Sequence, residues 1–214
     1  MADLTITGRV RRGDLDLRVD LTIAPGVTAI VGANGAGKTS LLRVIAGLDA
    51  LTEGALVVGD TVLDQPAQRH FVAAEQRDVA YAFQEPRLFP HLSVLDNLAY
   101  PLRRQGRSVT VARDDAAGIG DRLGLGPVLA ARPRDLSGGQ AQRVNIGRAL
   151  AVGAGTLLLD EPLASIDDAS RHELRERLRS AAASRVVWVT HDPADLLQAD
   201  EVISLPGLEH PRER

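Results

Sequence analysis

The first part of the chain alternates between apolar and polar residues, most clearly at Leu15, Leu17, Val19, Leu21 and Ile23. A period of two places every second side chain on the same face, so residues 3–23 are predicted to form antiparallel strands with one buried face. A hairpin is expected at residues 56–63, where Gly59 and Asp60 interrupt an apolar run.

Farther along, strand patterns alternate with helical ones. Short apolar runs typical of buried strands lie at residues 27–31, 79–83, 156–159 and 186–190. Apolar spacing typical of helices lies at residues 38–48, 94–105, 110–123, 139–150, 168–183 and 193–198. Alternation of this kind favours an α/β fold with a parallel central sheet covered by helices. We expect one domain over residues 1–214, with a helical lobe at about residues 85–150 inserted into it.

Composition limits the class of protein without identifying it. The 214 residues are 44% hydrophobic and 25% charged with no cysteine, which is ordinary for a globular protein and leaves no disulfide or thiolate metal site. A net charge of −3 gives no broad attraction to nucleic acid, so we expect no nucleic-acid partner. No apolar stretch is long enough for a membrane span, and the N-terminus lacks the apolar core of a secretory signal.

Residues 32–39 match the phosphate-loop pattern GxxxxGK[ST] at every defined position, between a predicted strand and a predicted helix. Glycines let the backbone amides converge on phosphates, and the helix adds the positive end of its dipole. Lys38, the only lysine of the chain, is expected to reach the β- and γ-phosphates, while the Thr39 hydroxyl holds Mg²⁺. The pattern alone indicates a nucleoside triphosphate, since kinases, GTPases and motor ATPases share it. The predicted nucleotide-binding residues here are Gly32, Ala33, Asn34, Gly35, Ala36, Gly37, Lys38, Thr39 and Ser40.

Two acids follow the apolar run at residues 156–159. Ligands of open α/β sheets bind at the carboxyl ends of the strands, which is where Asp160 and Glu161 fall. Asp160 is expected to bind the Mg²⁺ shell and Glu161 to polarise the water that attacks the γ-phosphate. Read alone, the pair would also suit a solvated strand end.

A second candidate anion site begins at Ser137, where a hydroxyl and two glycines precede a helical run. By itself this is also what a simple serine helix cap looks like. However, the pentapeptide at residues 136–140, lying between a phosphate loop and an acidic strand end, resembles the signature of ABC ATPases. The resemblance covers nearly the whole chain and implies the ABC ATPase fold, a P-loop NTPase core with an N-terminal antiparallel subdomain and a helical lobe.

The resemblance also assigns roles to residues that would be unremarkable alone. Gln84 is similar to the glutamine that contacts Mg²⁺ and water, and His191 to the histidine that contacts the γ-phosphate. With Glu161 and Lys38 they complete the expected catalytic set, and with Thr39 and Asp160 Gln84 completes the expected metal set. Residues 163–167, ending in Asp167, resemble the loop that communicates between two ATPase subunits.

In this family two subunits enclose two ATP molecules head to tail, so each completes the other's site. The resemblance therefore implies ATP and Mg²⁺ as cofactors and a homodimer as the active form, with slow hydrolysis by the monomer. The trans-subunit contacts would be Ser137, Gly138, Gly139, Gln140 and Asp167. Permease subunits and, indirectly, a substrate-binding protein are the further partners, which places the chain at the cytoplasmic face of a membrane.

Several stretches are most similar to molybdate-importer ATPases, among them residues 26–30, 35–40, 87–91 and 160–165. The implied function is ATP-driven import of molybdate or a related oxyanion. The alternatives are a sulfate, iron or polyamine importer, an exporter subunit, a non-transport ABC ATPase, or a module that has lost catalysis. The region formed by residues 83–84 and 88–91 would belong to the surface that receives a permease helix, or to ordinary packing of the lobe.

Two departures from the resemblance matter. Many such ATPases carry a C-terminal regulatory domain, and because the sequence ends at Arg214 we expect no feedback regulation within it. The family also stacks adenine on an aromatic residue before the phosphate loop, whereas no aromatic residue precedes Phe71 here. The corresponding position falls near Arg12, whose planar guanidinium could stack on the base or could be a solvated surface group.

Overall fold

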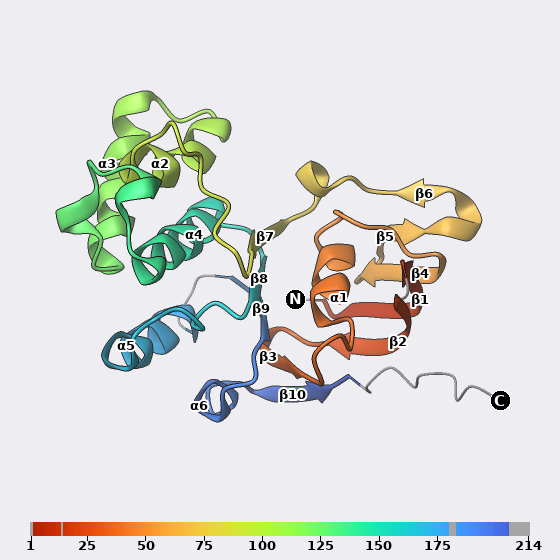
Figure 1. Cartoon of the computed structure of the whole chain (residues 1–214). Coiled ribbons are helices and arrows are strands. Elements are labelled where there is room, and N and C mark those ends of the chain that lie inside the picture. The colour runs from red at the N-terminus through yellow and green to blue at the C-terminus, as the bar shows by residue number, and fades with distance from the viewer. Residues whose placement is uncertain (1, 14, 180–182, 206–214) are drawn as a thin grey trace. The chain divides into compact units, whose positions relative to one another are not determined.

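The computed structural model describes residues 2–13, 15–179 and 183–205. It divides into two compact units, one of residues 1–79 with 184–214 and the other of residues 80–183 (Figure 1).

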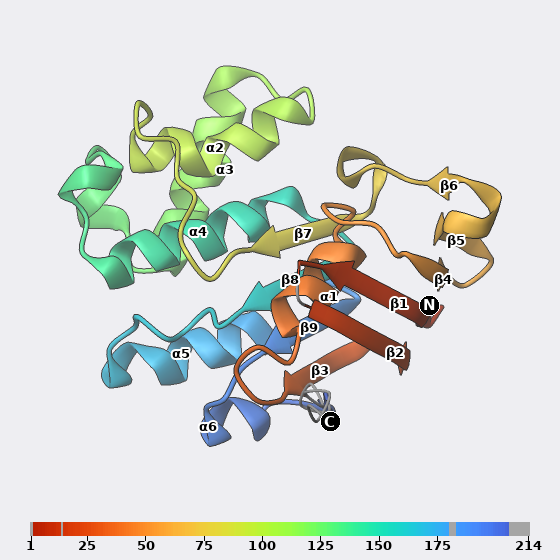
Figure 2. The ribbon, with the colours of Figure 1, turned by 45° about the vertical axis from the view of Figure 1, so that its right-hand side comes forward.

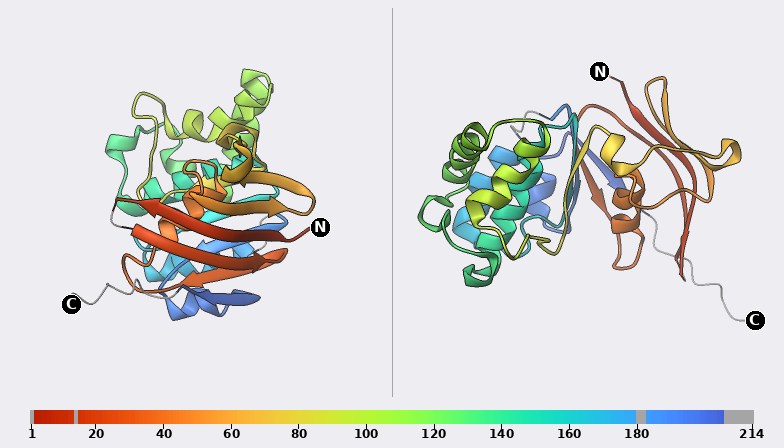
Figure 3. Two further views of the ribbon diagram at one scale, coloured as in Figure 1. Left: turned by 90° about the vertical axis from the view of Figure 1, so that its right-hand side faces the viewer. Right: turned by 90° about the horizontal axis from the view of Figure 1, so that it is seen from above.

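The first unit contains an antiparallel sheet, seen face-on in the left view of Figure 3. Its strands are β1 (Leu4–Arg12), β2 (Leu15–Ile23), β4 (Glu53–Val58), β5 (Thr61–Gln65) and β6 (His70–Phe71), in the order β2-β1-β4-β5-β6. The alternation in β1 gives one buried face, with Leu4, Ile6 and Val10 at most 1% exposed. Gly8 and Gly54 lie opposite each other, and a Cβ on either would stand 2.0 Å from a neighbouring carbonyl oxygen.

The same unit contains three parallel strands, with β3 (Gly26–Val31) between β9 (Arg185–Val189) and β10 (Glu201–Ser204). Every residue of β9 is buried, as expected for a parallel strand covered on both faces. A short helix, α6 (Pro193–Leu196), connects β9 to β10.

Helix α1 (Lys38–Ile45) lies between the antiparallel sheet and β3 (Figures 1 and 3). Its apolar residues Leu41, Leu42, Val44 and Ile45 are fully buried. The guanidinium of Arg77 holds the far end of the helix by donating to the carbonyl oxygens of Val44 at 2.6 Å and Ile45 at 3.0 Å. Burial lowers the pKa of Arg77. These bonds satisfy carbonyls that a helix cannot pair by itself.

In its described residues the second unit contains β8 (Thr156–Asp160), which lies next to β7 (Val79–Ala82), and four α-helices. Helix α2 (Val94–Arg104) contacts both α3 (Val109–Arg122) and α4 (Gly138–Val152), as Figure 2 shows, and α5 (Asp168–Arg179) follows β8. Short 3₁₀ turns complete the two units at Pro66–Gln68, Ala74–Gln76, Gly126–Val128 and Pro133–Asp135.

The predicted strands and helices are present, with shifted ends and two additions. Helix α1 stops at Ile45 rather than 48, because Gly47 adopts φ of 75° and its backbone runs against Arg77. Part of the predicted helix 168–183 lies outside the described residues. The short strands β6 and β10 were not predicted, since two to four residues give too little periodicity. Within the part of the chain that the structure describes, no helix is long and apolar enough to cross a bilayer.

Two helical glycines of the second unit should respond in opposite ways to the same substitution. At Gly118 in α3 a Cβ would meet its nearest atom at 3.7 Å, whereas at Gly147 in α4 it would stand 2.6 Å from Leu123 and 2.7 Å from Leu98. Gly118→Ala should raise the free energy of unfolding by about 0.5–1 kcal/mol through helix propensity. Gly147→Ala should lower it by roughly 1–2 kcal/mol, because overpacking outweighs that gain. Urea denaturation measures both, and equal shifts would contradict the packing described here.

Candidate functional site

The phosphate-loop residues of the first unit form a glycine-shaped turn in front of α1. Gly35 and Gly37 have φ of 82° and 91°, a backbone region that favours glycine. The Lys38 ammonium closes the turn by donating to the carbonyl oxygens of Gly32 at 2.8 Å and Ala33 at 2.9 Å. Helix α1 has no side-chain cap at Gly37, so the amides of its first turn remain oriented toward an incoming anion.

The remaining phosphate-loop residues differ in how far they are exposed to solvent. Asn34 and Thr39 are exposed, so the Thr39 hydroxyl is accessible to a metal ion, whereas Ala36 and Ser40 are buried against the unit. The loop also touches the antiparallel sheet. A Cβ at Gly37 would lie 2.8 Å from Leu17 and 3.3 Å from Leu15, so the start of β2 packs directly on the loop.

Arg12 ends β1 and pairs in register with Leu15, which brings it to the loop side of the hairpin. The alternation of β1 puts Arg12 on the same face as buried Val10. Its guanidinium lies 3.6 Å from the carboxylate of Asp49, and its side chain is 56% exposed. Asp49 accepts two bonds from Arg43 of α1, at 2.7 and 2.9 Å. The hydrogen bond from Arg43 lowers the pKa of Asp49, and the charge of Arg12 lowers it further.

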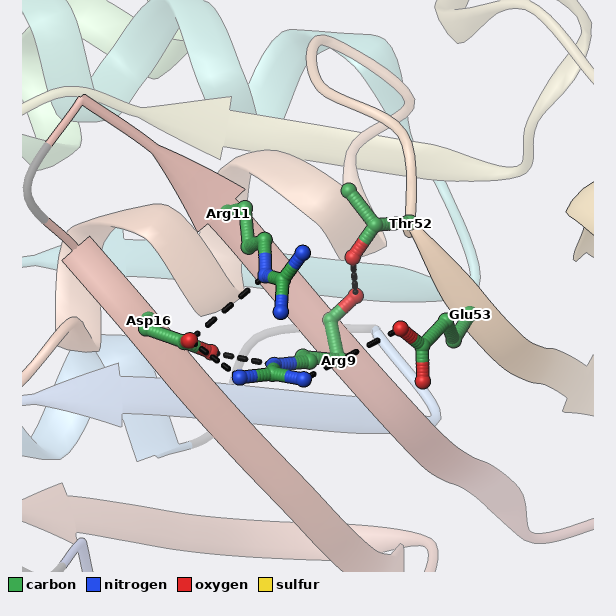
Figure 4. A network of polar contacts seen from close by, with 5 residues as sticks. All are labelled: Arg9, Arg11, Asp16, Thr52 and Glu53. Carbon is green, nitrogen blue, oxygen red and sulfur yellow. Dashed lines mark hydrogen bonds and ion pairs between the residues drawn. The ribbon is translucent and has the colours of Figure 1, made fainter.

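Arg9 and Arg11 of β1 form their ion pairs on the opposite face. Figure 4 shows Arg9 and Arg11 both turned toward Asp16, with Arg9 also near Glu53 and its carbonyl bonded to the Thr52 hydroxyl. The hydrogen bond from Arg9 lowers the pKa of Asp16. Because Asp16 serves Arg9 and Arg11, the partner of Arg12 is Asp49, a residue that sequence reasoning did not single out.

His191 follows β9 in the first unit and is exposed. Its neighbours shape a rigid turn. The Thr190 hydroxyl donates to Asp195 and accepts from the amide of Asp192 at 3.1 Å, and the Asp192 carboxylate caps α6 through the amide of Ala194 at 2.8 Å. This turn presents the imidazole at the end of a parallel strand, the edge at which α/β proteins bind ligands.

The acidic pair lies in the second unit, at the end of β8. Asp160 is 2% exposed and accepts a hydrogen bond from the hydroxyl of Tyr81 at 2.9 Å. Glu161 is less buried, and its φ of 44° puts a non-glycine residue in the left-handed region. Strain of this kind is characteristic of functional positions. The Gln84 amide approaches the Glu161 carboxylate at 3.5 Å, the outer limit of a hydrogen bond.

The Ser137 segment forms a reciprocal cap on α4. The Ser137 hydroxyl accepts from the amide of Gln140 at 3.2 Å, and the Gln140 side chain accepts from the amide of Ser137 at 2.9 Å. A Cβ on Gly139 would stand 3.0 Å from the carbonyl oxygen of Ser165, so the signature segment and the 163–167 loop are packed together. Gly138 is less crowded, with its nearest neighbour at 4.0 Å.

Asp167, at the end of that loop, is tied to the helices on both sides of it. Its carboxylate accepts from the amide of Ser170 at 3.0 Å, and Arg143 of α4 donates to it at 3.2 Å. The hydrogen bond from the Ser170 side chain lowers the pKa of Asp167. Residues 163–167 are therefore held in a fixed position relative to α4.

The structure thus brings together several predicted residues within each unit. In the first unit the loop, Lys38 and the Arg12 hairpin are neighbours, and in the second Gln84 is beside Glu161 and the Ser137 segment is beside the 163–167 loop. Sequence reasoning missed Tyr81, Asp49 and Asn145, which donates to the carbonyl oxygen of Phe83 at 2.7 Å. No local pattern marks them, since each acts on a residue distant in sequence.

The oxygen donors present suit a metal ion that binds together with phosphates. Among the described residues, no three His, Cys, Asp or Glu side chains are grouped to hold a metal by themselves. Mg²⁺ characteristically takes one or two protein oxygens and fills its octahedron with phosphate and water. Gln84 and Asp160 of the second unit, and Thr39 of the first, each carry an oxygen donor of that type.

The fold and motifs define an ATP-binding cassette, and the comparisons agree. The family model described as "ABC transporter" matches residues 17–164, and the chain belongs to this family. The dimeric post-hydrolysis structure of the ATP-binding cassette MJ0796 bound to ADP and Pi aligns with TM-score 0.80 and 27% identity, covering 96% of this chain and 94% of that one. A further dimeric MJ0796 structure aligns with TM-score 0.80 and 28% identity, covering 98% and 97%.

Curated relatives are more similar in sequence. The molybdenum import ATP-binding protein ModC of Mesorhizobium japonicum is 41% identical over 202 residues, covering 91% of this chain and 53% of the relative. The protein of the same name from Thiobacillus denitrificans is 45% identical over 194 residues, covering 88% and 52%. The chain therefore spans about half the length of the curated relatives it matches.

The left-handed backbone at Glu161 predicts a difference in the free energy of unfolding between two variants. Glu161→Gly should be more stable than Glu161→Gln by roughly 0.5–1 kcal/mol. The reason is that relief of about 1–2 kcal/mol of left-handed strain exceeds the entropy that glycine adds to the unfolded chain, about 0.5–1 kcal/mol. Guanidinium denaturation of both variants measures the difference. A Gly variant no more stable than the Gln variant would mean that the site carries no backbone strain.

Proposed function

We propose that this chain is the ATP-hydrolysing subunit of an ABC transporter that imports molybdate or a related oxyanion. The observation that carries the proposal is the phosphate loop. Its left-handed glycines, its lysine closed on two carbonyl oxygens and its uncapped helix form an anion site in a chain of the ABC transporter family. The structural relative bound to ADP and Pi supports a nucleotide as the anion.

In this proposal each residue has a task that its environment suits. Amides of residues 35–39 and the Lys38 ammonium bind the phosphates, with Lys38 exchanging its loop carbonyls for phosphate oxygens. Glu161 orients the attacking water and accepts its proton, while Gln84 and His191 hold the water and the γ-phosphate. Thr39, Gln84 and Asp160 would hold Mg²⁺, which neutralises charge on the phosphates.

A second copy of the chain completes the site. The Ser137 segment offers a hydroxyl and helix amides without a large side chain in front of them, which suits phosphates bound to a partner subunit. The contact between Gly139 and Ser165 and the ties on Asp167 make this surface rigid before assembly. The dimeric state of the MJ0796 structures supports a homodimer.

The proposed cargo is inferred from the curated relatives, which are named molybdenum import ATP-binding proteins. In this proposal the chain works at the cytoplasmic face of a membrane beneath permease subunits, and a substrate-binding protein delivers the oxyanion to them.

The second unit offers a surface for the permease. We call it the aromatic pocket, a cavity of about 370 Å³ lined by Tyr81, Phe89, Tyr100, Pro101, Arg104, Gln105, Arg148, Ala149 and Val152. Burial lowers the pKa of Arg148, and one of its terminal nitrogens is buried without a hydrogen-bond partner. An apolar helix of the permease that presents an oxygen acceptor to Arg148 would fit this pocket.

Hydrolysis should depend on Glu161 while binding should not. Glu161→Gln removes the proton acceptor and is expected to lower the ATP hydrolysis rate at least ~100-fold with the affinity for ATP retained. The variant should also form a dimer with ATP on size-exclusion chromatography, because the bound nucleotide persists. Glu75→Gln is the control, because Glu75 is an exposed acid that lies far from Glu161 in the sequence. A rate strictly linear in protein concentration, with no dimer even for Glu161→Gln, would refute the two-copy site.

Base binding should depend on Arg12 and on the carboxylate that holds it. Arg12→Ala should weaken ATP and GTP roughly 5-fold, about the worth of one cation–π contact, and leave inorganic tripolyphosphate unaffected. Asp49→Asn should have a smaller effect in the same direction, because it releases the guanidinium. Arg11→Ala, equally exposed but on the opposite face of β1, is the matched control. Calorimetric titration measures all of these, and unchanged affinities for ATP and GTP in Arg12→Ala would contradict the assignment.

A further inference from the structure

Tyr81 has two distinct surfaces within the second unit. Its hydroxyl donates to Asp160 at 2.9 Å, from β7 to the end of β8. Its ring lines the aromatic pocket together with Phe89 and Tyr100, and packs against Phe83 with the ring centroids 4.3 Å apart. A single rigid side chain therefore reaches from a surface cavity to a buried carboxylate.

The hydrogen bond determines how Asp160 can act. A carboxylate that is 2% exposed has few ways to satisfy its oxygens, and Tyr81 occupies one of them. The other oxygen is then held in a defined direction, because the carboxylate cannot rotate without breaking the bond. A metal shell, with its strict octahedral geometry, is sensitive to that direction.

The ring provides the other end of the link. A tyrosine side chain has only two torsions that move its ring, so a shift of the ring carries the hydroxyl with it. Tyr81 is half-buried and its ring packs against Phe83, while Arg148 lies over the Phe89 ring of the same pocket at 5.1 Å. A group entering the pocket would therefore press on Tyr81 and on the bond to Asp160.

We propose that Tyr81 is a positioning residue that orients the Asp160 carboxylate for Mg²⁺ and transmits occupation of the aromatic pocket to it. The inference rests on the proposed function, since it assumes that Asp160 serves a nucleotide-bound metal. It adds a direct route from the pocket to the metal carboxylate that is independent of Gln84.

Metal binding tests whether Tyr81 orients the Asp160 carboxylate for the metal ion. Mn²⁺ replaces Mg²⁺ as a probe, and its binding to the ATP-loaded Glu161→Gln protein is followed by electron paramagnetic resonance. Adding Tyr81→Phe should weaken Mn²⁺ roughly 10-fold while ATP affinity in EDTA stays the same. Tyr100→Phe, which changes the other tyrosine of the same pocket, should leave both unchanged. Unaltered Mn²⁺ affinity in Tyr81→Phe overturns the proposal.

The result separates the proposal from the proposed function. If the protein with Tyr81 intact binds neither ATP nor Mn²⁺ with ATP, the proposed function fails. If it binds both and Tyr81→Phe binds them equally well, only the role of Tyr81 fails. An equal loss of ATP affinity in EDTA would show a general structural defect and would likewise overturn the positioning role.

The chain has two tyrosines, so fluorine labelling can test whether Tyr81 transmits occupation of the aromatic pocket to Asp160. Protein labelled with 3-fluorotyrosine should give two ¹⁹F resonances, assigned through Tyr100→Phe, and only that of Tyr81 should move when Mg²⁺ joins bound ATP. Val152→Phe enlarges a half-exposed side chain that lines the pocket. It should shift the Tyr81 resonance and lower Mn²⁺ affinity severalfold with Tyr81 present, and have no effect on affinity with Tyr81→Phe. Equal effects in both backgrounds would overturn the link.

Discussion

The first turn of α1 is the constraint on which the first unit depends. Its amides must stay unpaired to receive an anion, and unpaired amides are costly wherever water is excluded. The structure meets this by fixing everything around the turn. Lys38 closes the loop on its own carbonyls, β2 packs against Gly37, and Arg77 pairs the carbonyls at the other end of the helix. The helix is thereby held at both ends while its binding end stays open.

The second unit solves a different problem, which is to hold carboxylates of different character side by side. Asp160 is buried and bonded to Tyr81, whereas neighbouring Glu161 is less buried, has a left-handed backbone and touches Gln84 only loosely. A fixed carboxylate suits a metal shell, and a less constrained one suits proton transfer. In the proposed function these adjacent residues have separate roles, and the strand ends between them.

Sequence patterns gave most of the elements because each pattern is local. The continuous apolar runs that become β8 and β9 are buried at every position, and the alternation of β1 and β2 becomes one buried face. Errors occur where local signals are short or overridden. Strands β6 and β10 are too brief to show a period, and α1 ends before residue 48 because Gly47 adopts φ of 75° where its backbone lies against Arg77.

The sequence by itself determined which chemical groups are present and in which order. These are a phosphate loop, an acidic strand end and a glycine-rich helix start. Those features lie within a few consecutive residues, so their spacing is visible without coordinates. Only the tertiary structure decided which distant residues support them. Tyr81 meets Asp160, Asp49 stands between Arg12 and Arg43, and Ser165 covers Gly139. Such contacts depend on strand pairing and side-chain packing, which bring together residues that share no pattern along the chain.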